Sequence, residues 1–271
     1  MLHSTQGIVF HSVKYSDTSL IVKIYTELFG IRSYIFRGVR NPKSRIKAGF
    51  FQPLTLLDMV VYHRDKQTLQ SVKEIRLSHP YHSIPFDIHK SSLVLFINEL
   101  LYHSIREEEA NPELFSFIYN TCVTLDETVV PVASFHLLFM LQLCHHLGIF
   151  PQVNFSVDHP VFNMTEGQFQ STIPDHPHYF DPATSRLFYQ MLRISATDLG
   201  ILFPPAADSA SSVPFPAVAP EREAARCGII LPSMNATLRN QIVESLLQYY
   251  ELHLPGFRKV MSHRILHGIF I

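Results

Sequence analysis

The hydrophobic pattern of this chain changes its period once, close to residue 80, and that change limits the folds open to it. Before Pro80, apolar residues come in five short segments that are rich in Val, Ile, Tyr, Phe and Thr and partly alternate with polar residues. After Pro85, they recur every three to four positions, which is typical of helices. The sequence therefore predicts an α+β chain, with a strand-rich domain over residues 1–80 and an all-α helical domain over residues 81–271.

The five expected strands are separated by turn-forming residues. They cover residues 6–14, 18–26, 30–38, 54–64 and 68–77, with turn signals at Tyr15-Ser16-Asp17, Leu28-Phe29-Gly30 and Asn41-Pro42-Lys43. Five short strands suit a closed barrel, because closure leaves no exposed sheet edge. The OB-fold is the five-stranded barrel that binds oligonucleotides on one face, and we expect it here.

Helix signals dominate the second domain. One helix is expected over residues 89–106, and the next begins at Asn111-Pro112-Glu113, where Asn caps the helix and Pro opens its first turn. An apolar helix over about 132–147 ends at Gly148, and later helices cover about 185–196, 238–253 and a short stretch near the C-terminus. Residues 154–181 are expected to form an irregular or hairpin-like excursion, and the Pro-rich residues 204–220 a mobile loop.

Charge is divided unevenly between the two predicted domains. Residues 1–80 hold 12 Lys and Arg against 5 Asp and Glu, whereas residues 81–271 hold 10 against 18, so the net charge of −1 hides a basic half and an acidic half. Only the basic half attracts a polyanion. The N-terminal residues lack a signal-peptide pattern, and no apolar run is long enough to span a bilayer, so we expect a cytoplasmic protein without membrane association.

The sharpest feature is the stretch of residues 28–57, which contains six basic residues and no acidic one. Basic side chains around the Asn41-Pro42 turn can reach phosphate oxygens. Tyr34 and Phe36 share a strand face with Arg32. Aromatic rings beside basic groups can bind single-stranded nucleic acid, because the rings stack on bases while the cations contact phosphates. The alternative is that both rings point into the barrel core. The candidate nucleic-acid-binding residues are Arg32, Tyr34, Phe36, Arg37, Arg40, Lys43, Arg45 and Lys47.

Signatures of catalysis and of metal binding are absent from the sequence. It contains no Gly-rich phosphate loop and no nucleophile elbow, so we expect no enzyme, no cofactor and no metal. Two alternatives stay open: an OB-fold protein acting on RNA, and a less favoured metal-dependent hydrolase built on His145, Asp158, His159, His176 and His178. The scattered cysteines, Cys122, Cys144 and Cys227, are expected to be reduced thiols in the core.

Two segments resemble a known family. Residues 7–45, with Gly7, Tyr15-Ser16-Asp17, Gly30 and the run from Gly38 to Ser44, resemble the start of RecO, the bacterial recombination mediator family. Residues 239–257 are similar to the last long helix of that family. The resemblance implies an OB-fold followed by a helical domain, binding to single- and double-stranded DNA, annealing of complementary strands, and cooperation with RecR to place RecA on strands coated by SSB.

The resemblance also implies a contact between the helical domain and the acidic C-terminal tail of SSB. The basic candidates there are few: Lys90, Arg106, Arg186, Arg193 and Arg239. Many RecO-like proteins carry a four-cysteine zinc knuckle after the central helix, but residues 154–181 contain no cysteine here. We therefore expect this excursion to be held by packing, chiefly of Phe155, Phe162, Phe169 and Phe180.

Overall fold

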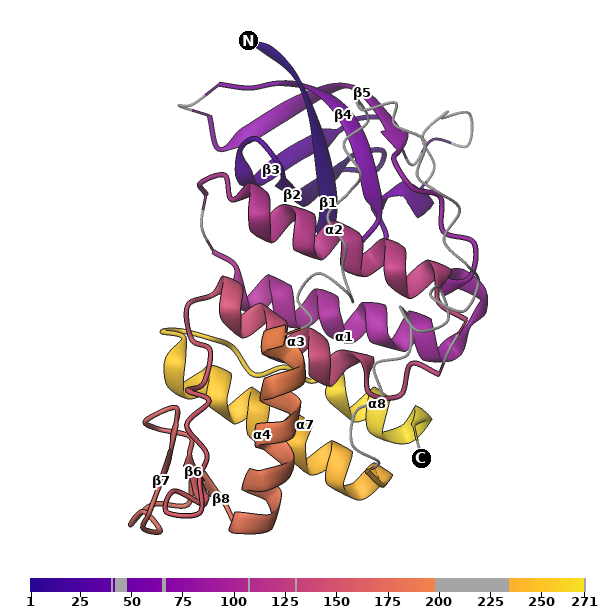
Figure 1. Cartoon of the computed structure of the whole chain (residues 1–271). Coiled ribbons are helices and arrows are strands. Elements are labelled where there is room, and N and C mark those ends of the chain that lie inside the picture. Colours follow the sequence, from indigo (N-terminus) through magenta and orange to yellow (C-terminus); the bar gives the residue numbers. More distant parts are fainter. Residues whose placement is uncertain are drawn as a thin grey trace, which may run out of the picture. The chain divides into compact units, whose positions relative to one another are not determined.

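A computed structural model describes residues 1–39, 41, 48–64, 67–106, 108–129, 131–197 and 234–270 of the chain. By its internal contacts the chain divides into two compact units, Met1–Glu127 and Thr128–Ile271. The first unit contains the five expected strands and the two helices that follow them (Figure 1). The two helices thus belong to the barrel's compact unit, and the domain boundary near residue 80 stays a prediction.

The first unit is built on a closed barrel of five strands, in the order β1-β2-β3-β5-β4. The strands are β1 (Leu2–Lys14), β2 (Leu20–Thr26), β3 (Gly30–Phe36), β4 (Leu56–Tyr62) and β5 (Leu69–Leu77). Neighbouring strands pair antiparallel except β3 and β5, which pair in parallel and close the barrel. The expected strands and the OB-fold are confirmed, and so is the α+β class.

Alternation within each strand sends one face into the barrel core. Val9, Val22, Ile24 and Leu57 are completely buried there. β1 pairs with both β2 and β4, and its register with β2 shifts at a bulge between Val9 and His11, which helps the long strand to bend around the barrel. A short 3₁₀ helix, η1 (Ala48–Phe51), precedes β4.

Two helices complete the first unit, α1 (Ile88–Ser104) and α2 (Pro112–Glu127). The expected start of α2 is confirmed, because the Asn111 side chain accepts a hydrogen bond from the Leu114 backbone N–H at 3.0 Å. α1 is tied to β1, since the Asn98 side-chain amide donates to the Phe10 backbone oxygen at 3.0 Å.

The linker between the barrel and α1, which includes the 3₁₀ helix η2 (Ile84–Phe86), is held by one buried carboxylate, that of Asp126 on α2. This carboxylate accepts hydrogen bonds of 2.9 to 3.1 Å from the backbone N–H groups of residues 82–84, and His79 Nε2 lies 3.1 Å from it. Lys90 Nζ donates to the Asp126 backbone oxygen at 2.9 Å. We call this cluster the Asp126 clamp.

The second unit contains the helices α3 (Phe135–His146), α4 (Pro182–Thr197), α7 (Ala236–His253) and α8 (His263–Ile269). α3 is apolar nearly all round and packs on α7, where the Tyr250 hydroxyl donates to the Met140 backbone oxygen at 2.7 Å. Gly148, with a φ of +70°, follows the end of α3 as expected. The Pro-rich residues 204–220 lie outside the described residues.

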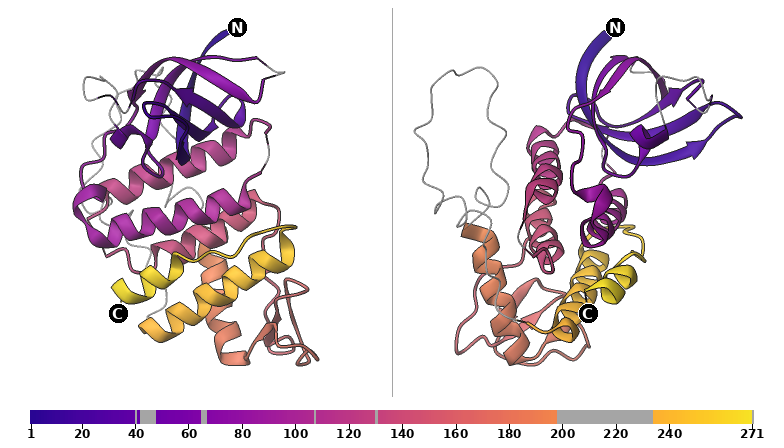
Figure 2. Two further views of the ribbon diagram at one scale, coloured as in Figure 1. Left: turned by 180° about the vertical axis from the view of Figure 1, so that it is seen from behind. Right: turned by 90° about the vertical axis from the view of Figure 1, so that its right-hand side faces the viewer.

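Residues 154–181 form a small sheet rather than an irregular loop alone. Its strands, β6 (Val161–Asn163), β7 (Gln168–Gln170) and β8 (Tyr179–Phe180), lie in the order β7-β6-β8. Figure 2 draws this excursion and the helices of the second unit from two further sides. Phe162 stacks or tilts against Phe169, Phe180 and Phe188, with ring centroids 4.7 to 5.8 Å apart, and Phe155 lies edge-on to Phe169 at 5.5 Å. The expected packing of these phenylalanines is confirmed.

Candidate nucleic-acid interface

The structure describes two of the six basic residues in stretch 28–57, Arg32 and Arg37. Arg40, Lys43, Arg45 and Lys47 lie outside the described residues, so their contribution stays a prediction. Arg32 lies on β3, and Arg37 directly follows the end of that strand. The geometry of the candidate site therefore depends on these two residues and on what surrounds them.

The two aromatic candidates, Tyr34 and Phe36, face the barrel core and not solvent. Tyr34 is 0% exposed and Phe36 is 4% exposed, and the Phe36 ring packs against Phe51 with centroids 4.5 Å apart. Burial also raises the pKa of the Tyr34 hydroxyl to about 12. The hypothesis that these rings stack on bases is thus corrected in favour of the core alternative, because strand alternation directs positions 34 and 36 inward.

Arg32 is partly neutralised by a carboxylate from the loop between α1 and α2. Its Nη1 lies 3.1 Å from Glu108 Oε2, and the Arg32 side chain is 21% exposed. This carboxylate comes from a position 76 residues further along the chain. Arg32 therefore offers less positive charge to a ligand than its sequence context suggests.

Arg37 and Lys14 are exposed at one end of the barrel, on either side of β2. Leu20, the first residue of β2, pairs with Lys14 of β1 and with Phe36 of β3, the residue before Arg37. Among the described residues, no carboxylate lies within 4 Å of either cation. The sequence reading missed Lys14, although its place before the first strand-to-strand loop of an OB-fold was a usable signal.

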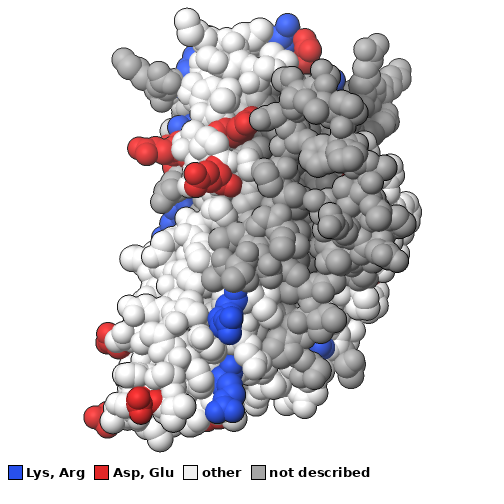
Figure 3. Space-filling view, in the orientation of Figure 1, with Lys and Arg blue, Asp and Glu red and all other residues white. Residues whose placement is uncertain are grey.

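Two other barrel cations have acidic neighbours, and a third, Lys23, lies over the Tyr102 ring with its Nζ 5.1 Å from the centroid. Lys73 lies 3.2 Å from Glu74, and Arg76 lies 2.9 Å from Asp58. On the face of the molecule drawn in Figure 3, the described Lys and Arg side chains are scattered and do not form one continuous patch. The barrel end that carries Lys14 and Arg37 is therefore the best candidate surface for a polyanion. In the sequence, the basic stretch of residues 40–47 follows shortly after Arg37.

Comparison with known proteins connects this barrel to a family. The sequence profile described as "Recombination protein O N terminal" matches residues 1–81, and the profile "Recombination protein O C terminal" matches residues 85–210. The chain belongs to the RecO family. Relatives named "DNA repair protein RecO" include one from Flavobacterium psychrophilum, 32% identical over 98% of both chains, and one from Christiangramia forsetii, 34% identical over all of both chains.

Membership of the RecO family places the chain in DNA repair, as a mediator of recombination. A relative from Bacteroides fragilis, 32% identical over the whole of both chains, carries the same name. None of the described helices is long and apolar enough to cross a membrane.

The pairing of Arg32 with Glu108 leads to a first prediction for this RecO-family chain. Arg32 lies toward the barrel end opposite to Lys14 and Arg37, so we expect Glu108→Gln, which frees its charge, to tighten DNA binding only slightly, by about twofold. Fluorescence anisotropy with a labelled oligonucleotide measures the affinity. Glu113→Gln, which changes the same charge at an exposed position on α2, is the control and should change the affinity less. Equal effects of the two variants would contradict the specific role of Glu108.

The zinc knuckle of many RecO-like proteins does not fit this chain. Residues 154–181 supply no cysteine, and aromatic rings of the excursion pack on one another instead. Within the described ranges, no group of three or more His, Cys, Asp or Glu is placed to hold a metal ion. His145, a candidate in the hydrolase alternative, instead stacks on Phe150 with ring centroids 3.4 Å apart, and burial lowers its pKa.

The described cysteines match their expected place in the core. Cys122 and Cys144 are free and buried, and burial raises the pKa of each thiol to about 12. A thiol in that state is a poor nucleophile at neutral pH. Cys227 lies outside the described residues.

Two of the five candidate contacts for the SSB tail have structural roles. Lys90 is 5% exposed and belongs to the Asp126 clamp. Arg239 is 8% exposed, and its guanidinium donates to the Phe270 backbone oxygen. Arg186 and Arg193 of α4 are exposed, so they are better placed to meet an acidic peptide.

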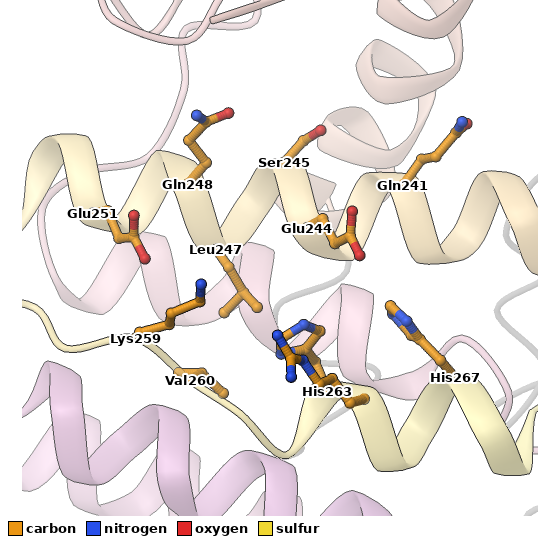
Figure 4. Close-up of a pocket in the computed structure, with 11 residues that line it drawn as sticks. Gln241, Glu244, Ser245, Leu247, Gln248, Glu251, Lys259, Val260, His263 and His267 are labelled. Atoms are coloured by element: carbon orange, nitrogen blue, oxygen red, sulfur yellow. The ribbon is translucent and has the colours of Figure 1, made fainter.

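A pocket of about 680 Å³ lies in the second unit between α7 and α8 (Figure 4). Glu244 and Glu251 extend from the α7 wall, and Lys259 lies on the facing wall beside His263. His263 is 7% exposed, and its Nδ1 has no hydrogen-bond partner in the described part of the chain. The pocket is therefore lined by charged and polar side chains of both signs.

Proposed function

We propose that this RecO-family chain binds single- and double-stranded DNA through the barrel end that carries Lys14 and Arg37, together with Arg40, Lys43, Arg45 and Lys47. The observation that supports this most directly is an OB-fold barrel with two exposed cations, Lys14 and Arg37, that have no carboxylate within 4 Å in the part of the chain that the structure describes, and a stretch of sequence, residues 28–57, without any acidic residue. Such cations bind the phosphate backbone and release counterions, so binding should weaken as salt rises.

The proposed mechanism needs no covalent step, no cofactor and no catalytic residue. Neutralising the backbone of a bound strand reduces its repulsion of a second strand, and contacts confined to phosphates leave base edges free to pair. Annealing of complementary strands follows from these two effects. By the family resemblance, the protein would act in the cytoplasm with RecR, contact the C-terminal tail of SSB, and so help RecA to load onto SSB-coated DNA.

A salt titration of a charge variant tests the proposed site. We expect replacement of Arg40, Lys43, Arg45 and Lys47 by Ala to weaken DNA binding, and to flatten the plot of log affinity against log salt by up to about 0.7 per lost phosphate contact on single strands. The control replaces Lys73 and Arg76, which already have acidic neighbours, by Ala. An unchanged slope in the fourfold variant would remove this stretch from the mechanism, and preference for a ribo-oligomer in competition would favour the RNA alternative.

A further inference from the structure

Tyr15 is an aromatic side chain that the fold leaves in solvent. It is 62% exposed, and no described residue makes a ring contact with it. The turn that carries it is well ordered, because Tyr15 N–H and Ser16 N–H both donate to the Ser19 backbone oxygen, at 3.0 and 3.3 Å. Ser19 N–H in turn donates to Ser16 Oγ at 3.2 Å. The ring is therefore presented from a fixed backbone.

The surroundings of Tyr15 are those of the candidate DNA surface. The residue directly follows Lys14, and it connects β1 to β2 at the same barrel end as Arg37. Asp17 is the one carboxylate of the turn and already has a partner. An exposed aromatic ring shares this barrel end with two cations that have no carboxylate within 4 Å among the described residues. Single-strand sites use this combination, with cations on the backbone and a ring under a base.

We propose that Tyr15 is the base-stacking residue of this surface and gives the protein a preference for single-stranded over double-stranded DNA. The inference rests on the proposed function, since it assigns a residue to the same DNA site. Tyr15 takes the stacking role that the sequence suggested for Tyr34 and Phe36, whose rings are buried in the barrel core. Paired bases in a duplex are already stacked on one another, so only an unpaired base can lie on the Tyr15 ring.

A second exposed tyrosine shows why Tyr15 is favoured. Tyr62 is 47% exposed at the opposite barrel end, where Leu2 and Tyr62 pair. At that end Glu108 pairs with Arg32, and the backbone of Glu109 approaches Gly30 so closely that a Cβ on Gly30 would lie 2.3 Å from it. Tyr62 is therefore an exposed tyrosine outside the proposed DNA surface, which makes it a matched control.

The first test compares single- and double-stranded oligonucleotides bound by the full-length protein. We expect Tyr15→Leu to lose about fivefold to a hundredfold in affinity for an oligo-dT strand, because the apolar bulk remains while the stacking face is lost. Affinity for a duplex should change by less than about twofold, and the salt slope should stay unchanged because no charge is removed. Tyr62→Leu should leave both affinities near the wild-type values.

The second test uses the absence of tryptophan from this chain. Tyr15→Trp introduces a single reporter that retains a stacking face, so this variant should bind oligo-dT at least as tightly as the wild type, and its fluorescence should be quenched on binding. Tyr62→Trp provides the matched reporter at the other end, and its fluorescence should respond little.

The outcomes separate this inference from the proposed function. If the wild-type protein binds both DNA forms with a steep salt dependence, yet Tyr15→Leu keeps full single-strand affinity or Tyr15→Trp shows no quenching, the stacking role is wrong and the DNA site stands. If the wild-type protein binds neither form, both proposals fail. Selective loss of single-strand affinity in Tyr15→Leu, with quenching in Tyr15→Trp, supports the assignment.

Discussion

Replacing Asp126 by Ala is expected to destabilise the first unit by about 3 to 5 kcal/mol, which is typical when one partner of a buried charge cluster is removed. The substitution leaves the backbone N–H groups of residues 82–84 without their carboxylate acceptor, and it removes the negative charge that faces His79. Thermal unfolding followed by circular dichroism should show a melting temperature lower by about 10 °C or more.

The neighbouring residue provides the control, because Glu127 has the same charge but is exposed. Glu127→Ala should change the melting temperature by no more than a degree or two, since exposed charges contribute about 0 to 1 kcal/mol. A melting temperature of Asp126→Ala close to that of Glu127→Ala would show that the clamp contributes little to stability.

The Asp126 clamp also predicts the direction of the pH dependence. Burial alone would raise the pKa of the Asp126 carboxyl, but hydrogen bonds from the backbone N–H groups of His82, Ile84 and Ser83 outweigh burial and hold the pKa well below its usual range. Because the carboxyl has a lower pKa in the folded state than in the unfolded state, it stabilises the fold at pH values above the unfolded-state pKa of about 3.9. This contribution to the free energy of unfolding is lost as the pH falls below that value. The stability difference between wild type and Asp126→Ala should therefore be largest at neutral pH and shrink in acid.

Phe162→Ala is expected to destabilise the second unit by about 3 to 5 kcal/mol. Phe162 is 1% exposed at the centre of the small sheet, and its ring lies against aromatic rings from β7, β8 and α4. Its removal opens a cavity in a sheet for which the described residues offer no group of metal ligands. Differential scanning calorimetry should show a transition lowered by about 10 °C or more.

Val157→Ala is the control for the aromatic cluster, because Val157 lies in the same excursion but is 93% exposed. It should leave the transition within about a degree of the wild type, since surface substitutions change stability by about 0.5 kcal/mol or less. A chelator should not shift the wild-type transition either. A large chelator-induced shift would mean that a metal, and not this packing, stabilises the excursion.

Local sequence patterns predicted most of the fold. Alternation identified all five strands, and the caps at Asn111 and Gly148 placed a helix start and a helix end. These features succeed because they depend on residues within one turn or one strand. The aromatic core of residues 154–181 was also predictable, because a segment without cysteine must be held by packing and its phenylalanines are its largest apolar side chains.

The candidate site was less predictable because it depends on contacts between distant residues. Alternation showed that Arg32, Tyr34 and Phe36 share a face of β3, but which face lies inside is decided by pairing with β2 and β5. The neutralisation of Arg32 by Glu108 joins residues 76 positions apart, and no local pattern reports it. Tyr15 was recognised only as part of a turn, since exposure is a property of the finished barrel.

The Asp126 clamp has a consequence for the order of events during synthesis. All five barrel strands leave the ribosome before α2 does, and the carboxylate that holds the linker follows residues 82–84 by about 40 positions. At translation rates of about 5 to 20 residues per second, Asp126 emerges roughly 2 to 8 seconds after the linker residues 82–84. A nascent barrel can therefore close and contact α1 early, but the linker between them gains its carboxylate acceptor only when the end of α2 has emerged.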